Sequence, residues 1–558
     1  MLKLSIMINS VLLKLLSILI FFISLFPLYS QIADNYPPRS DEIAALDKFF
    51  LELGETPPFY SRPFSNHQYF YYLEQIESRQ YNLSPSSKRL FSKLLEKHRW
   101  MSEKETFLLP VLEASAELKY QNREIPDSHK YLYYRESLDS PPLLNTGFIA
   151  GSPHAAVHLE YDLRKDFFVY SRQKDYSNLP TGDPFVQDFD FNFPTRSYLK
   201  VGNLHLDLLI GREQIKWGPG YRSSLVVSDS PPYYDMLLFS YFSESFKASF
   251  FFTALESYLT KEELKIQQDM TDIGTISFEK EASDQYKALT GHRFEFKFHD
   301  TLLIGVSDVL LFGGRAPELN EISPLIFLHN VYGENYSNVM MGFDASYVPV
   351  HNVRIYGELA IDDIRNSWEA GSSIPTTTGK MAGLQVMNTP LPGSPDFYYE
   401  WARLDPWMYN RWQPYLIFSS RRKLVSFPDS TKYASYLDFP TGYFLGGDVQ
   451  TFYFELAWSH NPQLNTSLSY EFRQKGEIYL NVLDPASKYE NYKENTEATP
   501  TGTPIVSHIV KAKGKFQISP RVTLSGNITT GYRQNREHEA GQNGFFFETT
   551  LNGAIKFY

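Results

Sequence analysis

Residues 292–300, HRFEFKFHD, alternate aromatic and charged side chains without a break. A β-strand points successive side chains to opposite faces, so Phe294, Phe296 and Phe298 share one face and the charged residues share the other. The same period of two recurs in residues 157–164, 204–211, 353–362 and 451–460. A soluble β-sandwich also alternates, but it would have to be repeated several times to fill the chain from residue 107 onward. The pattern therefore predicts one large sheet between an apolar and a polar environment.

Composition narrows the fold class. Tyr and Phe are abundant, with 39 and 43 residues, yet the mean hydropathy is −0.34. Beyond the N-terminus, no apolar run approaches the ~20 residues that a membrane helix needs. Aromatic enrichment without long apolar runs is typical of outer-membrane barrels, so we predict an all-β transmembrane barrel, antiparallel, in the outer-membrane lipid of a diderm bacterium. The net charge of −11 does not favour nucleic acid as a partner.

The N-terminus carries an export signal. Lys3 and Lys14 precede an apolar run over residues 15–28, and the polar region begins after Ser30. We interpret residues 1–30 as a secretory signal peptide read by the export machinery; a retained membrane anchor is disfavoured because the run is short and no stop-transfer charges follow. The chain has no Cys, which excludes a lipid-modified N-terminal Cys, disulfides and thiolate metal sites.

Residues 31–105 follow a helical period instead. Apolar side chains recur at helical spacing in residues 41–54, 65–79 and 84–104. Ser84 followed by Pro85 is a favourable helix start, with a capping hydroxyl and then a residue that needs no N–H donor. We expect a small α-helical region at 31–105, either periplasmic or a plug, followed by the barrel at 106–558.

The connections alternate in length. Short joints such as residues 460–465 contrast with long polar segments at 178–195, 366–380, 426–442 and 485–502. Outer-membrane barrels show this asymmetry, with short periplasmic turns and long outer loops. At about 25 residues per strand with its share of connections, the chain from residue 107 gives roughly 18 strands, and 16 is the alternative. Residues 545–558 end on an aromatic residue and resemble the terminal strand that the barrel-assembly machinery recognises.

A motif interrupts this regular pattern at residues 211–229, GREQIKWGPGYRSSLVVSD. A Gly-Pro-Gly trio disfavours continuing strand and predicts a tight excursion of the backbone. Trp217 is the one large side chain offered there, beside Arg212, Glu213, Gln214 and Ser224. A flat indole stacks on the apolar face of a sugar ring while polar neighbours bind its hydroxyls, so the motif is a candidate glycan site.

This segment resembles the signature of the outer-membrane capsule assembly Wzi family, in which a strand end is followed by Trp-Gly-Pro-Gly and a Ser-Leu-rich strand. Lys216 stands where a second Trp is frequent, and Ser228-Asp229-Ser230 replaces Ser-Asn-Asn, so glycan specificity is expected to differ. The resemblance implies a surface lectin that binds capsular or related polysaccharide without converting it and needs no cofactor. The glycan-binding positions carried over by resemblance are Arg212, Trp217, Gly218, Pro219, Gly220 and Ser224. The alternative is that the turn only shapes the barrel, with Arg212 paired to a lumen carboxylate.

Catalysis has little support in the sequence. No Gly-x-Ser-x-Gly, His-Glu-x-x-His or phosphate-binding Gly-rich loop occurs. The acidic residues available for glycan cleavage are Asp188 with Asp190 and Glu358 with Asp362 and Asp363. We expect them to be solvated or bound to Arg. His154 and His158 lie about 13 Å apart on a strand, too far to share a metal without other ligands.

Two other functions remain open, a diffusion porin or transporter and a surface structural or adhesion protein. The contents of the lumen discriminate between the first of these and the lectin. Helices closing the periplasmic end favour a lectin, whereas an inward-folded long loop between opposed rows of Arg and Asp or Glu favours a porin.

Overall fold

The computed structural model describes residues 34–102, 106–122, 141–165, 175–178, 189–190, 195–273, 286–314, 322–323, 337–363, 376–411, 413–425, 434–461, 463–480 and 498–557. The predicted signal peptide, residues 1–30, lies outside these ranges. None of the helices described there is long and apolar enough to cross a membrane.

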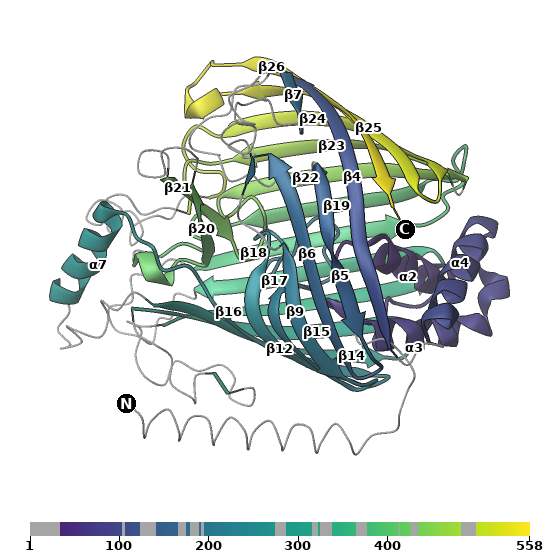
Figure 1. The fold of residues 1–558 in the computed structure, drawn as a ribbon. Helices are drawn as coiled ribbons and strands as arrows, with labels where there is room; N and C mark the ends of the chain where they lie inside the picture. Colours follow the sequence, from purple (N-terminus) through teal and green to yellow (C-terminus); the bar gives the residue numbers. More distant parts are fainter. Residues whose placement is uncertain are drawn as a thin grey trace, which may run out of the picture.

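Within the described residues, eighteen long strands close into one antiparallel barrel (Figure 1). The last strand pairs with the first, with Leu551 opposite Leu118, so the sheet has no free edge. This confirms the predicted fold class and the larger of the two expected strand numbers. The strands are β4 (Phe107–Gln121), β5 (Leu144–Gly151), β6 (Ala155–Lys165), β9 (Arg196–Gly202), β10 (Leu206–Glu213), β12 (Tyr234–Phe242), β13 (Phe246–Ala254), β14 (Lys287–Phe298), β15 (Leu302–Gly313), β16 (Ser337–Val350), β17 (Val353–Asp363), β18 (Thr377–Val386), β19 (Asp396–Leu404), β22 (Val449–Asn461), β23 (Leu464–Lys475), β24 (Ile505–Ser519), β25 (Val522–Gln534) and β26 (Gly544–Lys556).

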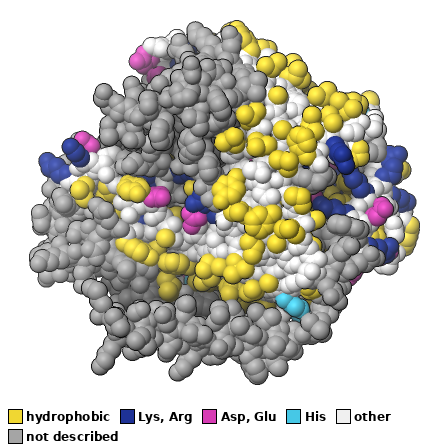
Figure 2. Space-filling view, viewed as in Figure 1, with side chains coloured by type: hydrophobic (Ala, Val, Ile, Leu, Met, Phe, Trp, Pro, Cys, Tyr) yellow, Lys and Arg dark blue, Asp and Glu magenta, His cyan; other side chains and the backbone are white. Residues whose placement is uncertain are grey.

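The wall has an apolar outer face and a polar inner face. On β14, Phe296 and Phe298 are 40% and 49% exposed, while Arg293 and Glu295 on the opposite face are buried. Figure 2 shows hydrophobic side chains spread over the strands of the wall, whereas Lys and Arg gather mainly at the end that carries the N-terminal helices. Exposed apolar side chains at alternate positions are the surface that lipid requires.

Three helices lie at the end of the barrel where the turns are short (Figure 1). They are α2 (Asp41–Glu52), α3 (Asn66–Glu77) and α4 (Pro85–Ser102). The hydroxyls of Ser40 and Ser65 accept backbone N–H groups three residues later and so cap α2 and α3. A helical cluster built on Phe49, Phe70 and Phe91 includes Phe242 and Leu303 of the barrel rim. Hydrogen bonds between residues 51–56 and the turns at residues 300 and 352 fix the helices to the wall.

The opposite end is closed by long connections that fold inward. Residues 214–233, here called the infolded loop, meet residues 404–409, 417–418 and 443–445 in an inner cluster that includes Trp217, Val227, Tyr409, Phe418 and Tyr443. The polar loop expected at residues 426–442 instead contains a strand, because β20 (Ser419–Val425) pairs with β21 (Ala434–Pro440) in a separate hairpin. The smaller elements are β1 (Asn35–Tyr36), β2 (Ser61–Arg62), β3 (Phe64–Ser65), η1 (Gln80–Asn82), β7 (Asp175–Ser177), β8 (Phe189–Asp190), β11 (Lys216–Trp217), α7 (Lys261–Ile273), η4 (Pro414–Leu416) and η5 (Arg536–His538).

A closed sheet of this kind resists sodium dodecyl sulfate until it is heated, because every interior strand is hydrogen-bonded on both sides. We expect unboiled protein to migrate faster than boiled protein on a denaturing gel. Identical mobility before and after boiling, together with detergent-independent solubility, would contradict the barrel.

Candidate functional site

The Trp-Gly-Pro-Gly turn lies inside the barrel, at the innermost part of the infolded loop. Its strand β11 pairs with β2, so Trp217 lies opposite Ser61 of the connection between α2 and α3. Trp217 is 2% exposed, and its ring packs edge-on against Phe251 at 5.0 Å. A Cβ added at Gly291 would lie 3.0 Å from the indole. The wall therefore encloses the indole, and no sugar ring has room to stack on it in this structure.

Steric contacts with the wall explain why the turn has glycine at position 218. Gly218 has a φ of +121°, and a Cβ there would lie 2.5 Å from the carboxylate of Glu358. That carboxylate accepts the backbone N–H groups of Gly220 and Leu225, both at 2.8 Å. The carbonyl of Pro219 accepts a hydrogen bond from Arg354 at 3.1 Å. The turn is thus held against β17 by one buried carboxylate and one buried guanidinium.

The other two predicted residues lie elsewhere. Arg212 shares the outer face of β10 with Ile210, which is 56% exposed. It forms two hydrogen bonds to Asp235, at 2.7 and 2.8 Å, and its guanidinium lies 3.6 Å from the ring centre of Tyr233. Ser224 is fully buried in the infolded loop. The six motif residues are therefore not all brought to one surface.

A cavity of about 710 Å³ lies in the lumen beside the turn. Pro219 and Gly220 line it, together with the next two residues, Tyr221 and Arg222. Lining residues also come from the start of α2 and from the inner faces of β22 to β26 and β4. These strand residues were not expected in the site from the sequence. The signal was the period of two in residues 511–515, KAKGK, which places three lysines on one face of a strand.

Charged and aromatic side chains together line this cavity. Glu471 accepts hydrogen bonds from Arg222 at 2.9 Å and from Arg473 at 2.8 Å. The guanidinium of Arg222 also lies over the rings of Tyr453 and Phe444, at 4.4 and 4.8 Å. Tyr221 stacks on Tyr398 with ring centres 4.2 Å apart. Such an arrangement offers flat apolar faces beside fixed donors, which suits a sugar ring with polar substituents.

Burial changes the chemistry of the one lysine within the turn. Burial lowers the pKa of Lys216 to about 8. Its ammonium donates a hydrogen bond to the carbonyl of Gly220, four residues later in the same turn. Lys216 therefore acts as an internal brace of the loop.

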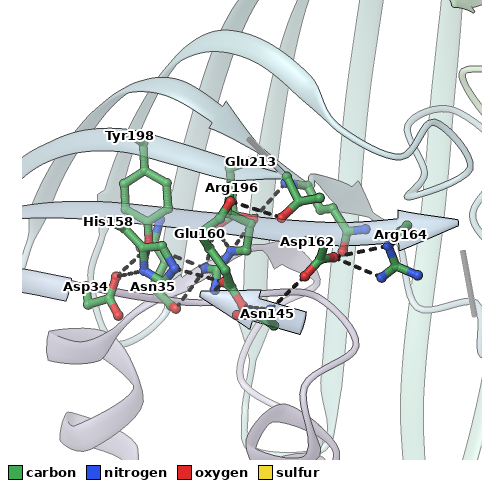
Figure 3. Close-up of polar contacts among 12 residues, drawn as sticks. Asp34, Asn35, Asn145, His158, Glu160, Asp162, Arg164, Arg196, Tyr198 and Glu213 are labelled. Atoms are coloured by element: carbon green, nitrogen blue, oxygen red, sulfur yellow. Dashed lines mark hydrogen bonds and ion pairs between the residues drawn. The ribbon is translucent and has the colours of Figure 1, made fainter. Parts of the chain in front are cut away.

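A buried ionic network fixes the N-terminal arm, residues 34–40, to strands β6 and β9 of the wall (Figure 3). Asp34 accepts hydrogen bonds from His158, at 3.1 Å, and from the hydroxyl of Tyr198. Lys200 donates to Asn35 at 2.6 Å. Burial alone raises the pKa of Asp34, but the hydrogen bond from His158 and the nearby positive charges outweigh it and hold that pKa well below its usual range.

A second anchor holds the connection between α2 and α3. Glu295 on β14 accepts the backbone N–H groups of Tyr60, at 2.6 Å, and Ser61, at 3.0 Å. Arg293 donates to the same carboxylate and to Asp344. Because Ser61 also pairs with Trp217, the helices, the infolded loop and the wall form one connected structure around the cavity.

Comparisons with known proteins agree with this architecture. A family model described as capsule assembly protein Wzi matches residues 154–530, more than half of the chain. A solved structure of Wzi, described as an outer-membrane protein involved in group 1 capsule assembly in Escherichia coli and a carbohydrate-binding β-barrel, is 12% identical. The match covers 94% of this chain and 99% of that one with a TM-score of 0.53, which shows the fold.

More distant matches include other outer-membrane proteins. OccK2 (OpdF) of Pseudomonas aeruginosa is 12% identical over 81% of this chain and 98% of that one, with a TM-score of 0.38. OmpT of Vibrio cholerae is 9% identical over 81% and 98%, with a TM-score of 0.31. A search of curated protein sequences gave no match.

Proposed function

The chain belongs to the capsule assembly protein Wzi family, and we propose that it binds a capsular or other surface polysaccharide at the outer membrane. In this role it helps to assemble or retain the polymer on the cell surface and does not convert it. The family membership carries this proposal. The lumen cavity, with its aromatic and charged lining, supports it independently because it offers a place for saccharide inside the barrel.

The lumen contents favour binding over diffusion. The helices lie at the short-turn end, which is the periplasmic end in outer-membrane barrels. An infolded loop is present too, but it fills the lumen with apolar side chains: Leu225, Val226 and Val227 belong to one cluster with Val309 and Met340 of the wall. We therefore propose that residues 31–105 form a periplasmic plug region, that residues 106–558 form the barrel, and that residues 1–30 are removed on export.

The acidic residues considered for cleavage support a non-catalytic role. Both oxygens of Glu358 accept backbone N–H groups of the infolded loop. Asp362 accepts the backbone N–H of Tyr409 at 2.7 Å. Asp188 lies outside the described residues. Carboxylates engaged in this way hold the fold and are not poised as an acid and base pair across a glycosidic bond.

We assign different parts in this function to the six motif residues. Pro219 and Gly220 contribute to the cavity wall. Trp217, Gly218 and Ser224 hold the loop that carries them, and Arg212 with Asp235 fixes the end of β10 beside the loop. Glycan contact is then made by the cavity residues that follow the turn, beginning with Tyr221 and Arg222.

Cells without this protein are expected to make a normal amount of polysaccharide but to release more of it into the medium. Cell-bound and released polymer are measured separately after gentle centrifugation, and total polymer is the internal control. Expression of the wild-type chain in the same cells should restore the bound fraction. Unchanged bound polymer together with slower uptake of small solutes would replace this function by a porin.

A further inference from the structure

We propose that the lumen cavity binds a carboxylate-bearing saccharide through the lysines of β24 and the arginines facing them. This inference rests on the proposed polysaccharide binding and adds the location and the charge of the bound sugar. The volume of about 710 Å³ lies within the range of about 300–1,000 Å³ typical of small-ligand sites. It therefore suits a short oligosaccharide or one segment of a longer polymer.

The charge of the cavity lining favours an anionic ligand. The whole chain has a net charge of −11, but the cavity is lined by ten Lys or Arg and six Asp or Glu. Several of those acids are already paired with lining bases. Arg62 binds Asp47 at 2.6 Å, Arg222 and Arg473 share Glu471, and Lys119 lies 3.5 Å from Glu548. Arg39 and Lys48 pair with Asp229 and Asp396, which do not line the cavity, so eight remaining bases face six acids and positive charge is in modest excess.

Two lining cations, Arg354 and Lys511, form no close ion pair with a carboxylate among the residues that the structure describes. Arg354 is 3% exposed, donates to the Tyr60 hydroxyl and the Pro219 carbonyl, and its Nε has no described hydrogen-bond partner. Lys511 forms no ion pair within the same described part of the chain. A buried guanidinium without a direct ion pair carries a desolvation cost, and a bound carboxylate offsets that cost.

The aromatic residues of the same cavity suit the sugar ring itself. Tyr221 is 36% exposed and is backed by Tyr398, so one of its faces is supported by a second ring. Glu455 accepts hydrogen bonds from the hydroxyls of Tyr221 and Tyr453, at 3.1 and 2.5 Å. A carboxylate that already binds hydroxyl donors suits sugar hydroxyls, and the aromatic faces suit the C–H face of the ring. Simple anions gain nothing from these groups.

The cavity is accessible from solvent at the start of α2. Asp41, the first residue of α2, lines the cavity and has a side chain that is 87% exposed, so the cavity reaches water there. It pairs with Lys515 at 2.9 Å. Lys511 and Lys513 lie on the inner face of β24 and line the cavity beyond this opening, whereas Lys515, already paired with Asp41, does not line it.

The test measures binding of the full-length mature barrel in detergent to short oligosaccharides released from the surface polysaccharide of the producing bacterium. The oligosaccharides are used as released and after chemical reduction of their carboxyl groups. The variants are Lys511→Gln and the double variant Lys511→Gln with Lys513→Gln. Lys515→Gln is the matched control, because this lysine lies on the same face of β24 but does not line the cavity. Heat modifiability confirms that each variant is folded.

We expect at least about tenfold weaker binding for Lys511→Gln and a larger loss for the double variant, because each removes a charge-assisted contact. Reduced oligosaccharides should bind wild type as weakly as native ones bind the double variant, and Lys515→Gln should bind within about twofold of wild type. If native and reduced sugars bind wild type and variants equally, the cavity assignment is overturned while polysaccharide binding stands. If wild type binds neither these oligosaccharides nor the intact polymer, the proposed function itself fails.

Discussion

Replacing Trp217 with alanine is expected to lower the free energy of unfolding by about 3–5 kcal/mol, because it removes one of the largest buried side chains and leaves a cavity inside the barrel. The void would lie between Phe251 and Gly291, where strand backbone cannot readily collapse. The fraction of heat-modifiable barrel should fall strongly, whereas the polysaccharide affinity of the molecules that do fold should be unchanged. Trp217→Phe refills part of the space and should lose much less.

Trp458→Ala provides the control for this experiment. Trp458 lies on β22 and is only partly buried, with its Nε1 donating to the Pro392 carbonyl at 3.1 Å. Its loss should therefore cost clearly less stability than that of Trp217. A normal yield of Trp217→Ala barrel with polysaccharide binding lost would show that the indole contacts sugar, which is the reading that its residue type suggests from the sequence alone.

The barrel was predictable because its signal is local. Alternation in residues 292–300 places Phe296 outside and Glu295 inside whatever the rest of the chain does, and repetition of this pattern leaves few other folds of this length. The start of α2 is local in the same way, since Ser40 caps it from one residue away. The wall, the approximate strand number and the position of the helices could therefore be predicted from local sequence patterns.

The interior was not predictable, because its contacts join residues far apart in the sequence. A Gly-Pro-Gly turn predicts an excursion of the chain, but the direction of that excursion is decided by Glu358, Arg354 and Ser61, each more than a hundred residues away. Trp217 is consequently recognisable from the sequence as a residue of interest, but the sequence leaves open whether it stacks on sugar or only shapes the barrel. Lys511 and Lys513 do not stand out in the sequence, because a cavity is a property of the assembled barrel.

The second large effect is expected on ion conductance, which should be low in wild type and high once both obstructions of the lumen are removed. Wild-type barrel is expected to give no steady channel in planar lipid bilayers, because two separate structures obstruct its described interior. The helical cluster covers the short-turn end, and the inner cluster around Trp217 and Tyr409 fills the other. Removing residues 34–102 should leave the inner cluster in place, so this variant should conduct rarely. Removing them and also replacing residues 216–230 with a short Gly-Ser link should produce steady, long-lived currents.

Conductance should therefore rise from wild type, through the variant without residues 34–102, to the doubly altered protein. The two closures are coupled through the pairing of β2 with β11, but each is a separate cluster. Glu295 contributes to the helical side of that coupling through Tyr60 and Ser61. Glu295→Ala should therefore raise the frequency of brief openings in the otherwise intact chain, because the connection loses its anchor. Heat modifiability of every variant shows that a barrel is present to conduct. Steady current through wild type, at the level of the doubly altered protein, would mean that the lumen is open and that solute diffusion, not saccharide binding, is what this barrel is built for.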